Sequence, residues 1–120
     1  MFVHLRTIKI NMEKEKETMS VADQDLVARF AKALAHPTRI EILVFLASQD
    51  SCFFGDIHDE FSIAKSTMSQ HLKELRDAGL IIGEIETPKV RYCIHKENWE
   101  TARRLLSNLF SLFDGKNVIC

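Results

Sequence analysis

Residues 62–80 read SIAKSTMSQHLKELRDAGL, and the apolar side chains in this stretch recur at the spacing of an α-helix. We expect that helix over about 65–78, with Gly79 closing it. On a helical wheel its apolar residues cluster on one side, namely Met68, Leu72 and Leu75. The opposite side is polar. The pattern therefore predicts a helix that packs on a core with one face and presents hydrogen-bonding side chains on the other.

The segments around this helix predict a helix-turn-helix pair followed by a hairpin. The connection Ser62–Ala64 joins it to a short helix expected just before it. Downstream, strand-like runs flank a polar tip at Thr87–Lys89. The expected elements are, in chain order, helices over about 21–34 and 37–50, a strand over 51–54, helices over 56–61 and 65–78, strands over 80–86 and 90–95, and a strongly apolar last helix from about 99 to 113. The predicted fold class is mainly α with a small β-hairpin wing, a winged helix-turn-helix of order ααβααββα.

Length and composition favour a single domain. A chain of 120 residues, 46% of them hydrophobic, is long enough for one core but too short for two ordinary domains. The segment from Asn11 to Thr18 is nearly all charged and has no apolar period, which is typical of a solvated arm. Met12 and Met19 leave the translation start open beside Met1. We expect an N-terminal arm over 1–20, the winged helix-turn-helix domain over 21–113 and a C-terminal tail over 114–120.

Charge and hydropathy limit the cellular location and the binding partners that we expect for the protein. No stretch approaches the roughly 20 apolar residues that a membrane-spanning helix needs, so we expect a cytoplasmic protein without a membrane partner. The three cysteines form no C-x-x-C pair and agree with a reduced cytosolic setting. The net charge of -1 supplies no overall basic field. Any nucleic-acid binding must therefore come from a local concentration of Lys and Arg.

The polar side of the 65–78 helix has the chemistry of a DNA-reading surface. An α-helix fits the major groove, where Ser, Thr and Gln hydrogen-bond to base edges, while Lys and Arg bind phosphates. The expected base-reading residues are Ser66, Thr67 and Gln70. The expected phosphate contacts are Lys65, Ser69, Lys73 and Arg76 on the helix, with Lys89 and Arg91 on the wing. The alternative is an ordinary solvated face, and the ordered combination of helices, turn and basic hairpin favours DNA over it.

Two stretches carry a resemblance to a known family. Residues 33–40, ALAHPTRI, and residues 69–81, SQHLKELRDAGLI, resemble the two hallmark stretches of the ArsR-type repressors. The resemblance runs from about Asp25 to Phe113. It implies a homodimer whose two recognition helices enter successive major grooves of an inverted-repeat operator in double-stranded DNA. It also implies a transcription repressor that releases DNA on a signal.

The resemblance implies that the first and last helices of the domain form the dimer. The apolar stripe of the last helix is also wider than one small domain needs to cover, which indicates a partner. The expected dimer-interface residues are Leu26, Phe30, Leu105, Leu109, Phe110 and Phe113.

Two departures from the family pattern bear on DNA binding. Many relatives place Ser or Thr at the cap of the recognition helix, whereas this chain has Ala64, so we expect Ser62 to cap the helix or the helix to begin elsewhere. The wing keeps Lys89 and Arg91 but adds Glu84 and Glu86 on the other strand. Those carboxylates would weaken phosphate binding unless they face away.

The ligands of the family's metal sensors are missing. Those relatives place a Cys-x-Cys pair at the start of the third helix, whereas Cys52 is the single thiol of the segment 51–56. Asp56 and His58 have ligand chemistry, but i and i+2 positions do not share a face of an α-helix. We therefore expect no metal site and no cofactor, and the inducer stays unidentified.

The fold that the resemblance implies brings two cysteines near each other. The strand before the third helix would pair with the outer wing strand, so that Cys52 and Cys93 become neighbours. Oxidation would then tie the wing to the third helix, which makes a redox switch a hypothesis. The simpler interpretation is that both thiols act as small half-buried hydrophobic side chains.

Enzyme activity is not expected. The sequence offers no Ser-His-Asp set, no paired carboxylates and no phosphate-binding glycine loop, so no catalytic residue is assigned. The other function class that fits is a winged-helix protein-interaction module, in which the polar helix binds a protein instead of DNA. Replacement of Gln70 and Lys73 by alanine would separate these two interpretations.

Overall fold

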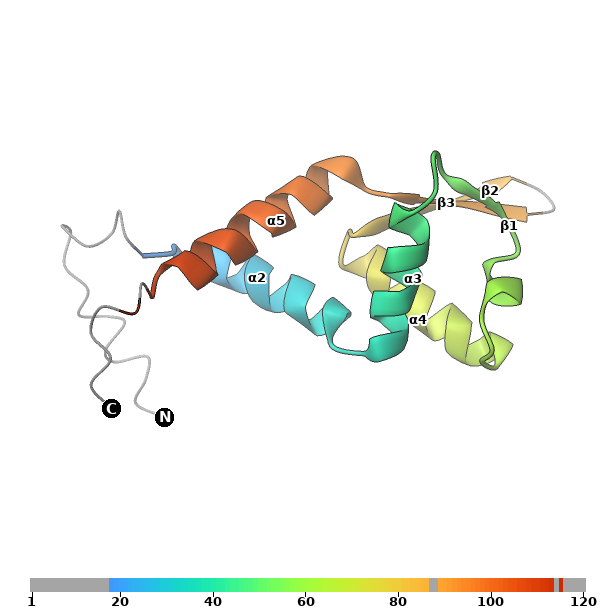
Figure 1. Ribbon diagram of the computed structural model, residues 1–120, viewed down its shortest axis with the longest axis horizontal. Helices are drawn as coiled ribbons and strands as arrows, with labels where there is room; N and C mark the ends of the chain where they lie inside the picture. Colours follow the sequence, from blue (N-terminus) through green and yellow to red (C-terminus); the bar gives the residue numbers. More distant parts are fainter. Residues whose placement is uncertain (1–17, 87–88, 114, 116–120) are drawn as a thin grey trace.

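The structure, a computed structural model, describes residues 18–86, 89–113 and 115. Within these residues the elements are, in chain order, α2 (Val21–Leu34), α3 (Pro37–Ala47), β1 (Phe53–Gly55), the 3-10 helix η2 (Ile57–Glu60), α4 (Lys65–Asp77), β2 (Ile81–Glu86), β3 (Lys89–Ile94) and α5 (Lys96–Ser111). Figure 1 shows α2 and α5 side by side at one end of the molecule and the three strands at the other, with α3 and α4 between them. The predicted winged helix-turn-helix is confirmed.

Local sequence signals explain where the helices begin. The Ser20 hydroxyl accepts a hydrogen bond of 3.1 Å from the Asp23 N–H and caps α2. His36 lies in extended backbone before Pro37, the first residue of α3, and its Nδ1 accepts the Thr38 N–H at 3.1 Å. Helices α2 and α3 are therefore separated by a polar junction that the His-Pro step enforces.

The core is one continuous apolar cluster to which every helix contributes. It gathers side chains from α2, α3, η2, α4, the wing and α5: Phe30, Ala33, Ile42, Leu43, Leu46, Ile57, Met68, Leu72, Leu75, Leu80, Ile81, Tyr92 and Ala102. Burial of these apolar side chains removes their surface from water, and this hydrophobic effect is the main force that stabilises the fold. The polar face of α4 lies on the far side of that helix from this cluster.

The sheet is antiparallel with strand order β1-β3-β2, so β3 is the central strand. In the β2–β3 hairpin, which is the wing, Ile81 pairs with Ile94 and Glu84 with Arg91. Short strand β1 pairs with the other edge of β3, where Phe53 faces Tyr92. The expected pairing of this strand with the wing strand that contains Cys93 is confirmed, and β1 occupies the edge of β3 that the hairpin leaves free.

The end of α4 is fixed by a glycine motif. The Gly79 N–H donates to the Arg76 carbonyl and the Leu80 N–H donates to the Leu75 carbonyl, which is the Schellman pattern. Gly79 has a φ of 84°, and a Cβ there would lie 2.6 Å from Nδ2 of Asn98. The same Asn98 amide donates to the Gly79 carbonyl at 2.9 Å. This joint sets the direction in which the chain leaves α4 for the wing.

Several boundaries differ from the sequence prediction, among them those of α5, which begins at Lys96 instead of near residue 99 and ends at Ser111 instead of near residue 113. The helix expected over 56–61 is only a 3-10 turn over Ile57–Glu60, and α3 ends at Ala47 instead of near residue 50. The first strand begins at Phe53. Helix η2 stays short because Phe61 at its C-cap returns to extended backbone and packs edge-on against Phe45 of α3. Of the expected arm, tail and wing tip, residues 1–17, 87–88, 114 and 116–120 lie outside the described part of the chain.

Candidate nucleic-acid interface

Helix α4 is held against the core by one face. Met68, Leu72 and Leu75 are 1%, 4% and 0% exposed, as their helical spacing predicts. On its flank, Glu74 accepts a hydrogen bond of 2.7 Å from Arg29 of α2, and both side chains are partly buried. A helix fixed by a packed face and a lateral ion pair presents its other face in a defined orientation.

The opposite face of α4 is polar and open to solvent. All seven residues expected to contact DNA from this helix are exposed: Lys65, Ser66, Thr67, Ser69, Gln70, Lys73 and Arg76. We call this set the α4 polar face. It contains hydroxyl and amide groups, which can hydrogen-bond to base edges, and cations, which can bind phosphates.

One cation of the α4 polar face has an internal partner. Lys73 Nζ donates to Oδ2 of Asp77 at 2.7 Å, and both side chains are largely solvent-exposed. This hydrogen bond, assisted by the charge of Lys73, lowers the pKa of the Asp77 carboxyl below its ordinary value. A phosphate that binds Lys73 therefore has to compete with the Asp77 carboxylate, which lies one helical turn away.

No side chain caps the first turn of α4 within the described residues. The helix begins at Lys65 with Ala64 as its N-cap residue, and the Met68 N–H donates to the Ala64 carbonyl. The expectation of a Ser62 cap or a different start was therefore wrong. Because Ala64 carries no acceptor, the positive end of the helix stays open towards solvent.

The wing packs on the C-terminal part of α4. A Cβ on Gly83 would lie 3.1 Å from Cδ of Arg76 and 3.1 Å from Cε1 of Tyr92, so the glycine makes room for both side chains. Tyr92 is buried, and desolvation raises the pKa of its hydroxyl. The wing thus packs closely beside the α4 polar face at Gly83, where a Cβ would require Arg76 or Tyr92 to shift slightly.

The wing cations are less available than the sequence indicated. Arg91 forms an ion pair with Glu84, its cross-strand neighbour, so this carboxylate does not face away. A phosphate has to compete with Glu84 for that guanidinium. Lys89 belongs to β3 by its backbone, but its side chain and that of Glu86 lie outside the described part of the chain.

His71 lies on the buried side of α4 against the α2–α3 junction. Its ring centroid is 4.3 Å from that of His36, and its side chain is 8% exposed. Desolvation, followed by the neighbouring His36 and Arg39, lowers its pKa. His71 therefore packs α4 onto the junction and does not belong to the α4 polar face.

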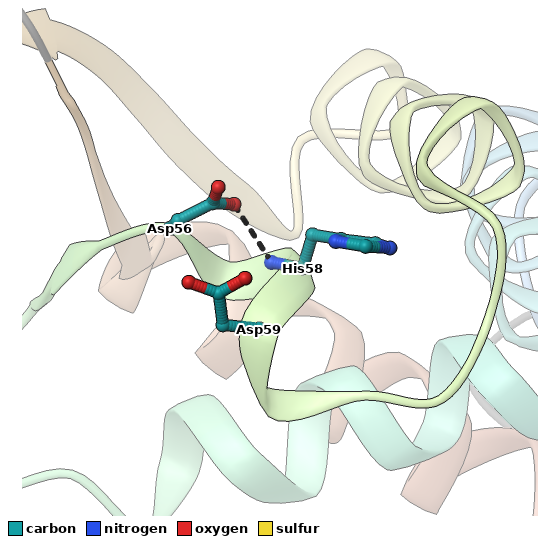
Figure 2. Close-up of side chains that lie close together, drawn as sticks. All are labelled: Asp56, His58 and Asp59. Carbon is teal, nitrogen blue, oxygen red and sulfur yellow. Dashed lines mark hydrogen bonds between the residues drawn. The ribbon is translucent and has the colours of Figure 1, made fainter.

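Three side chains around η2 have metal-ligand chemistry, and Figure 2 shows how they lie. Ligand atoms of Asp56, His58 and Asp59 come within 4.8 Å of one another, with Asp56 at the N-cap of η2 and the other two residues in its 3-10 turn. However, Oδ1 of Asp56 accepts the His58 N–H at 3.1 Å, and the His58 ring points away from both carboxylates, with Nε2 2.6 Å from the Ile63 carbonyl oxygen. These contacts cap η2 and anchor the turn before α4.

The expected dimer-interface residues fall into two groups. Phe30 and Leu105 are 3% and 1% exposed, so they belong to the interior of this chain and not to a free surface, which corrects their expected role. Their burial follows from the direct packing of α2 on α5. The remaining four expected residues stay exposed: Leu26, Leu109, Phe110 and Phe113. Exposed Val21 and Leu112 extend this apolar set and were missed in the sequence analysis.

The structure brings Cys52 and Cys93 together as a disulfide, with Cα atoms 4.5 Å apart. Both residues are half-buried. They line a cavity of about 490 Å³ together with residues at the end of α3 and the start of α5, including Gln49, Lys96 and Trp99. The neighbouring placement of the two cysteines on which the redox hypothesis depends is therefore present in the structure.

Comparison with known proteins identifies the family. The family described as "Bacterial regulatory protein, arsR family" matches residues 36–82, which contain the whole helix-turn-helix pair. The Biofilm growth-associated repressor of Agrobacterium fabrum is 32% identical over 87 residues, covering 72% of this chain and 71% of that protein. The chain belongs to the ArsR family of helix-turn-helix transcriptional regulators.

Other similar proteins agree with this assignment. The HTH-type transcriptional regulator CmtR of Mycobacterium tuberculosis is 37% identical over 71 residues, and the match spans 59% of each protein. An ArsR-like transcriptional regulator from Rhodococcus sp. RHA1 has the same fold, with a TM-score of 0.63 and 22% identity over 76% of this chain and 85% of that one. In the described part of this ArsR-family chain, no helix is both long and apolar enough to span a bilayer.

Proposed function

We propose that this chain is a homodimeric repressor that binds an inverted-repeat operator in double-stranded DNA with the α4 polar face. The observation that carries the proposal is the contrast between the two faces of α4. One is buried in the core and the other exposes all seven expected DNA-contacting side chains. Ser66, Thr67 and Gln70 read base edges in the major groove, and the cations position the helix on the backbone.

The uncapped first turn of α4 supports the same proposal. Lys65 lies at this helix end, where Ala64 offers no side-chain acceptor to the backbone N–H groups. A helix N-terminus favours anions through its N–H groups and dipole. A DNA phosphate beside Lys65 would supply the acceptors that the sequence does not, so binding would complete the cap.

The exposed apolar residues of α2 and α5 support a dimer. Phe110 and Phe113 are 74% and 68% exposed although they continue the apolar stripe of α5. Figure 1 places α2 and α5 together at the end of the molecule away from the wing. A second copy packed on this end would bury these side chains and leave both α4 helices free, as a two-fold operator requires.

Repression and cellular location follow from the same reasoning. A dimer that occupies an operator blocks other proteins from that DNA, and the name of the A. fabrum relative describes a repressor. A DNA-binding regulator works where the chromosome is, so we propose the cytoplasm. We propose no enzymatic role, because the relatives are transcriptional regulators.

The test of DNA reading is fluorescence anisotropy with DNA from upstream of the chain's own gene, repeated across salt concentrations and against scrambled DNA of equal length. We expect preferential binding that weakens steeply as salt rises, because phosphate contacts release counterions. Equal, weak binding to both fragments would contradict operator reading and favour the protein-interaction module.

The test of the dimer is sedimentation of the full chain at micromolar concentration. We expect a dimer that Phe110→Asp converts to monomer, because a carboxylate cannot be buried unpaired at the interface. Val44→Asp is the matched control, since Val44 is 64% exposed on α3. A monomeric wild-type chain, or equal dissociation of both variants, would contradict the proposed interface.

A further inference from the structure

The Cys52–Cys93 disulfide lies where the wing joins the body of the protein. Phe53 faces Tyr92 in the β1–β3 ladder, so Cys52 and Cys93 are the next opposed pair in the same register. Their Cα separation of 4.5 Å is that of directly opposed residues at a non-hydrogen-bonded position of an antiparallel pair. The disulfide therefore extends a ladder of only three residue pairs by one covalent link.

The same link connects two parts of the DNA-binding unit. Cys52 ends the loop that leaves α3, and Cys93 lies in β3 two residues after Arg91 of the wing. On its other side, Cys93 pairs with Ile82 of β2. Because β3 is the central strand, it is the element that joins β1 to the rest of the hairpin.

The disulfide is accessible to small molecules. Both cysteines are half-buried and line the cavity of about 490 Å³ between the end of α3 and the start of α5. Lys96 and Trp99 contribute a cation and an aromatic ring to its wall. A cavity of this size admits a small thiol.

We propose that Cys52–Cys93 is a thiol–disulfide switch that a low-molecular-weight thiol reaches through this cavity, and that reduction weakens DNA binding by releasing the wing from β1. The proposal rests on the proposed function, since it concerns the affinity for operator DNA. Disulfides in the cytosol are usually transient and redox-sensing, which favours a regulatory role over a structural one.

Reduction of the Cys52–Cys93 disulfide takes two electrons, which two molecules of the small thiol supply. Its thiolate attacks one cysteine sulfur, the S–S bond breaks, and the other cysteine leaves as a thiolate that takes up a proton. A second small thiolate attacks the mixed disulfide and releases the small-molecule disulfide, and the remaining cysteine sulfur is protonated. Cys52 and Cys93 end as thiols, and two small thiols have been oxidised. The reverse sequence, with the small-molecule disulfide as oxidant, closes the switch.

The test compares operator affinity of the full chain in its oxidised and reduced states. Dithiothreitol is the reductant, intact mass and thiol alkylation report the state of the cysteines, and anisotropy on the upstream DNA reports affinity. We expect reduction to raise Kd by at least about fivefold, the lower end of ordinary coupling between two sites. Cys52→Ser/Cys93→Ser should bind like the reduced chain with or without thiol. Cys120→Ser, which leaves the pair intact, should behave as wild type.

Each outcome separates the switch from the proposed function. Equal affinity in both states, with the disulfide verified by mass, overturns the switch and leaves DNA reading intact. Failure of the two cysteines to lose two hydrogen atoms on mild oxidation also overturns it. Tighter binding after reduction contradicts the proposed direction. Loss of operator preference in both states overturns the proposed function together with the switch. Circular dichroism shows whether the serine variant is folded. The comparison of the oxidised and reduced wild-type chain does not depend on that variant.

Discussion

Helix α4 and the wing both belong to the DNA-binding unit, but they are held in place by different means. Leu75 and Met68 anchor α4 in the core at 0% and 1% exposure. In the described part of the wing the buried side chains are Ile81 and Tyr92, Arg91 is paired with Glu84, and β3 is attached to β1 by a three-pair ladder and one disulfide.

This difference separates a fixed part from an adjustable part. Apolar packing is insensitive to redox state, so α4 keeps its orientation whether or not the cysteines are linked. A covalent link at the base of a small sheet can be opened by a chemical signal. We therefore expect sequence reading to depend on the packing of α4 and the regulation of affinity to depend on the attachment of the wing.

The largest effect should come from the anchor of α4. Leu75→Ala should lower the free energy of unfolding by about 2–5 kcal/mol, because it leaves a cavity at a fully buried position. Chemical denaturation followed by circular dichroism measures the loss. Ile82→Ala, at a side chain 39% exposed, should cost much less. Similar losses for both variants would show that α4 is not anchored through Leu75.

Opening the disulfide should have the next largest effect on stability. Reduction should lower the free energy of unfolding by about 2–4 kcal/mol, because the link closes a loop between cysteines 41 residues apart in the sequence. Thermal unfolding with and without dithiothreitol measures this loss, with Cys52→Ser/Cys93→Ser as the thiol-insensitive control. An unchanged melting temperature would mean that the non-covalent contacts of β1 already hold the wing.

A base-reading residue should affect recognition rather than folding. Gln70→Ala should cost about 1–3 kcal/mol of discrimination between the operator and a variant at the contacted base pair, because a bidentate hydrogen bond is lost. Anisotropy on matched and mismatched fragments measures it. The exposed side chain predicts an unchanged melting temperature. Uniform weakening across all sequences would assign Gln70 to the backbone instead.

The His36–His71 contact predicts a smaller, pH-dependent effect on the α4 anchor. Burial holds the pKa of His71 below its ordinary value near 6.5, so the unfolded chain binds the proton more readily than the folded one. Stability should therefore be full above about pH 6.5 and fall as the pH drops towards the lowered pKa. His71→Asn should flatten this part of the stability curve. An NMR titration that places the His71 pKa above 6.5 would contradict the account.

The smallest effect concerns Lys73, which forms an ion pair with Asp77 within α4. Asp77→Asn should tighten DNA binding by about two- to fivefold at low salt, because an exposed ion pair is weak and its loss frees Lys73 for a phosphate. The gain should shrink as salt rises. Weaker binding by this variant would show that the Lys73–Asp77 pair orients the lysine productively.

The order of elements and the two faces of α4 could be predicted because both depend on local patterns. The spacing of Met68, Leu72 and Leu75 fixes which side is buried, and Gly79 marks the end of the helix. Pro37 marks the start of α3 for an equally local reason. The family match adds the function of this unit but not the role of any single residue.

Other features depend on contacts that no local pattern encodes. The pairing of Arg91 with Glu84 follows from the register of the wing, and the 3-10 form of η2 follows from the return of Phe61 to α3. Phe30 and Leu105 have the spacing of interface residues, but the packing of α2 on α5 buries them within this chain. A helical stripe shows that a residue is buried without showing whether its own chain or a second copy buries it.

The central claim is that the α4 polar face reads DNA, and one comparison of variants tests it most directly. Operator binding is measured by anisotropy for the wild type, for Gln70→Ala/Lys73→Ala, and for Glu100→Ala/Arg103→Ala, which removes an exposed ion pair on α5. The account predicts that wild type and the α5 variant bind with the same steep salt dependence, while the α4 variant loses binding. Unchanged affinity of the α4 variant would contradict the assignment of this helix as the DNA-reading element.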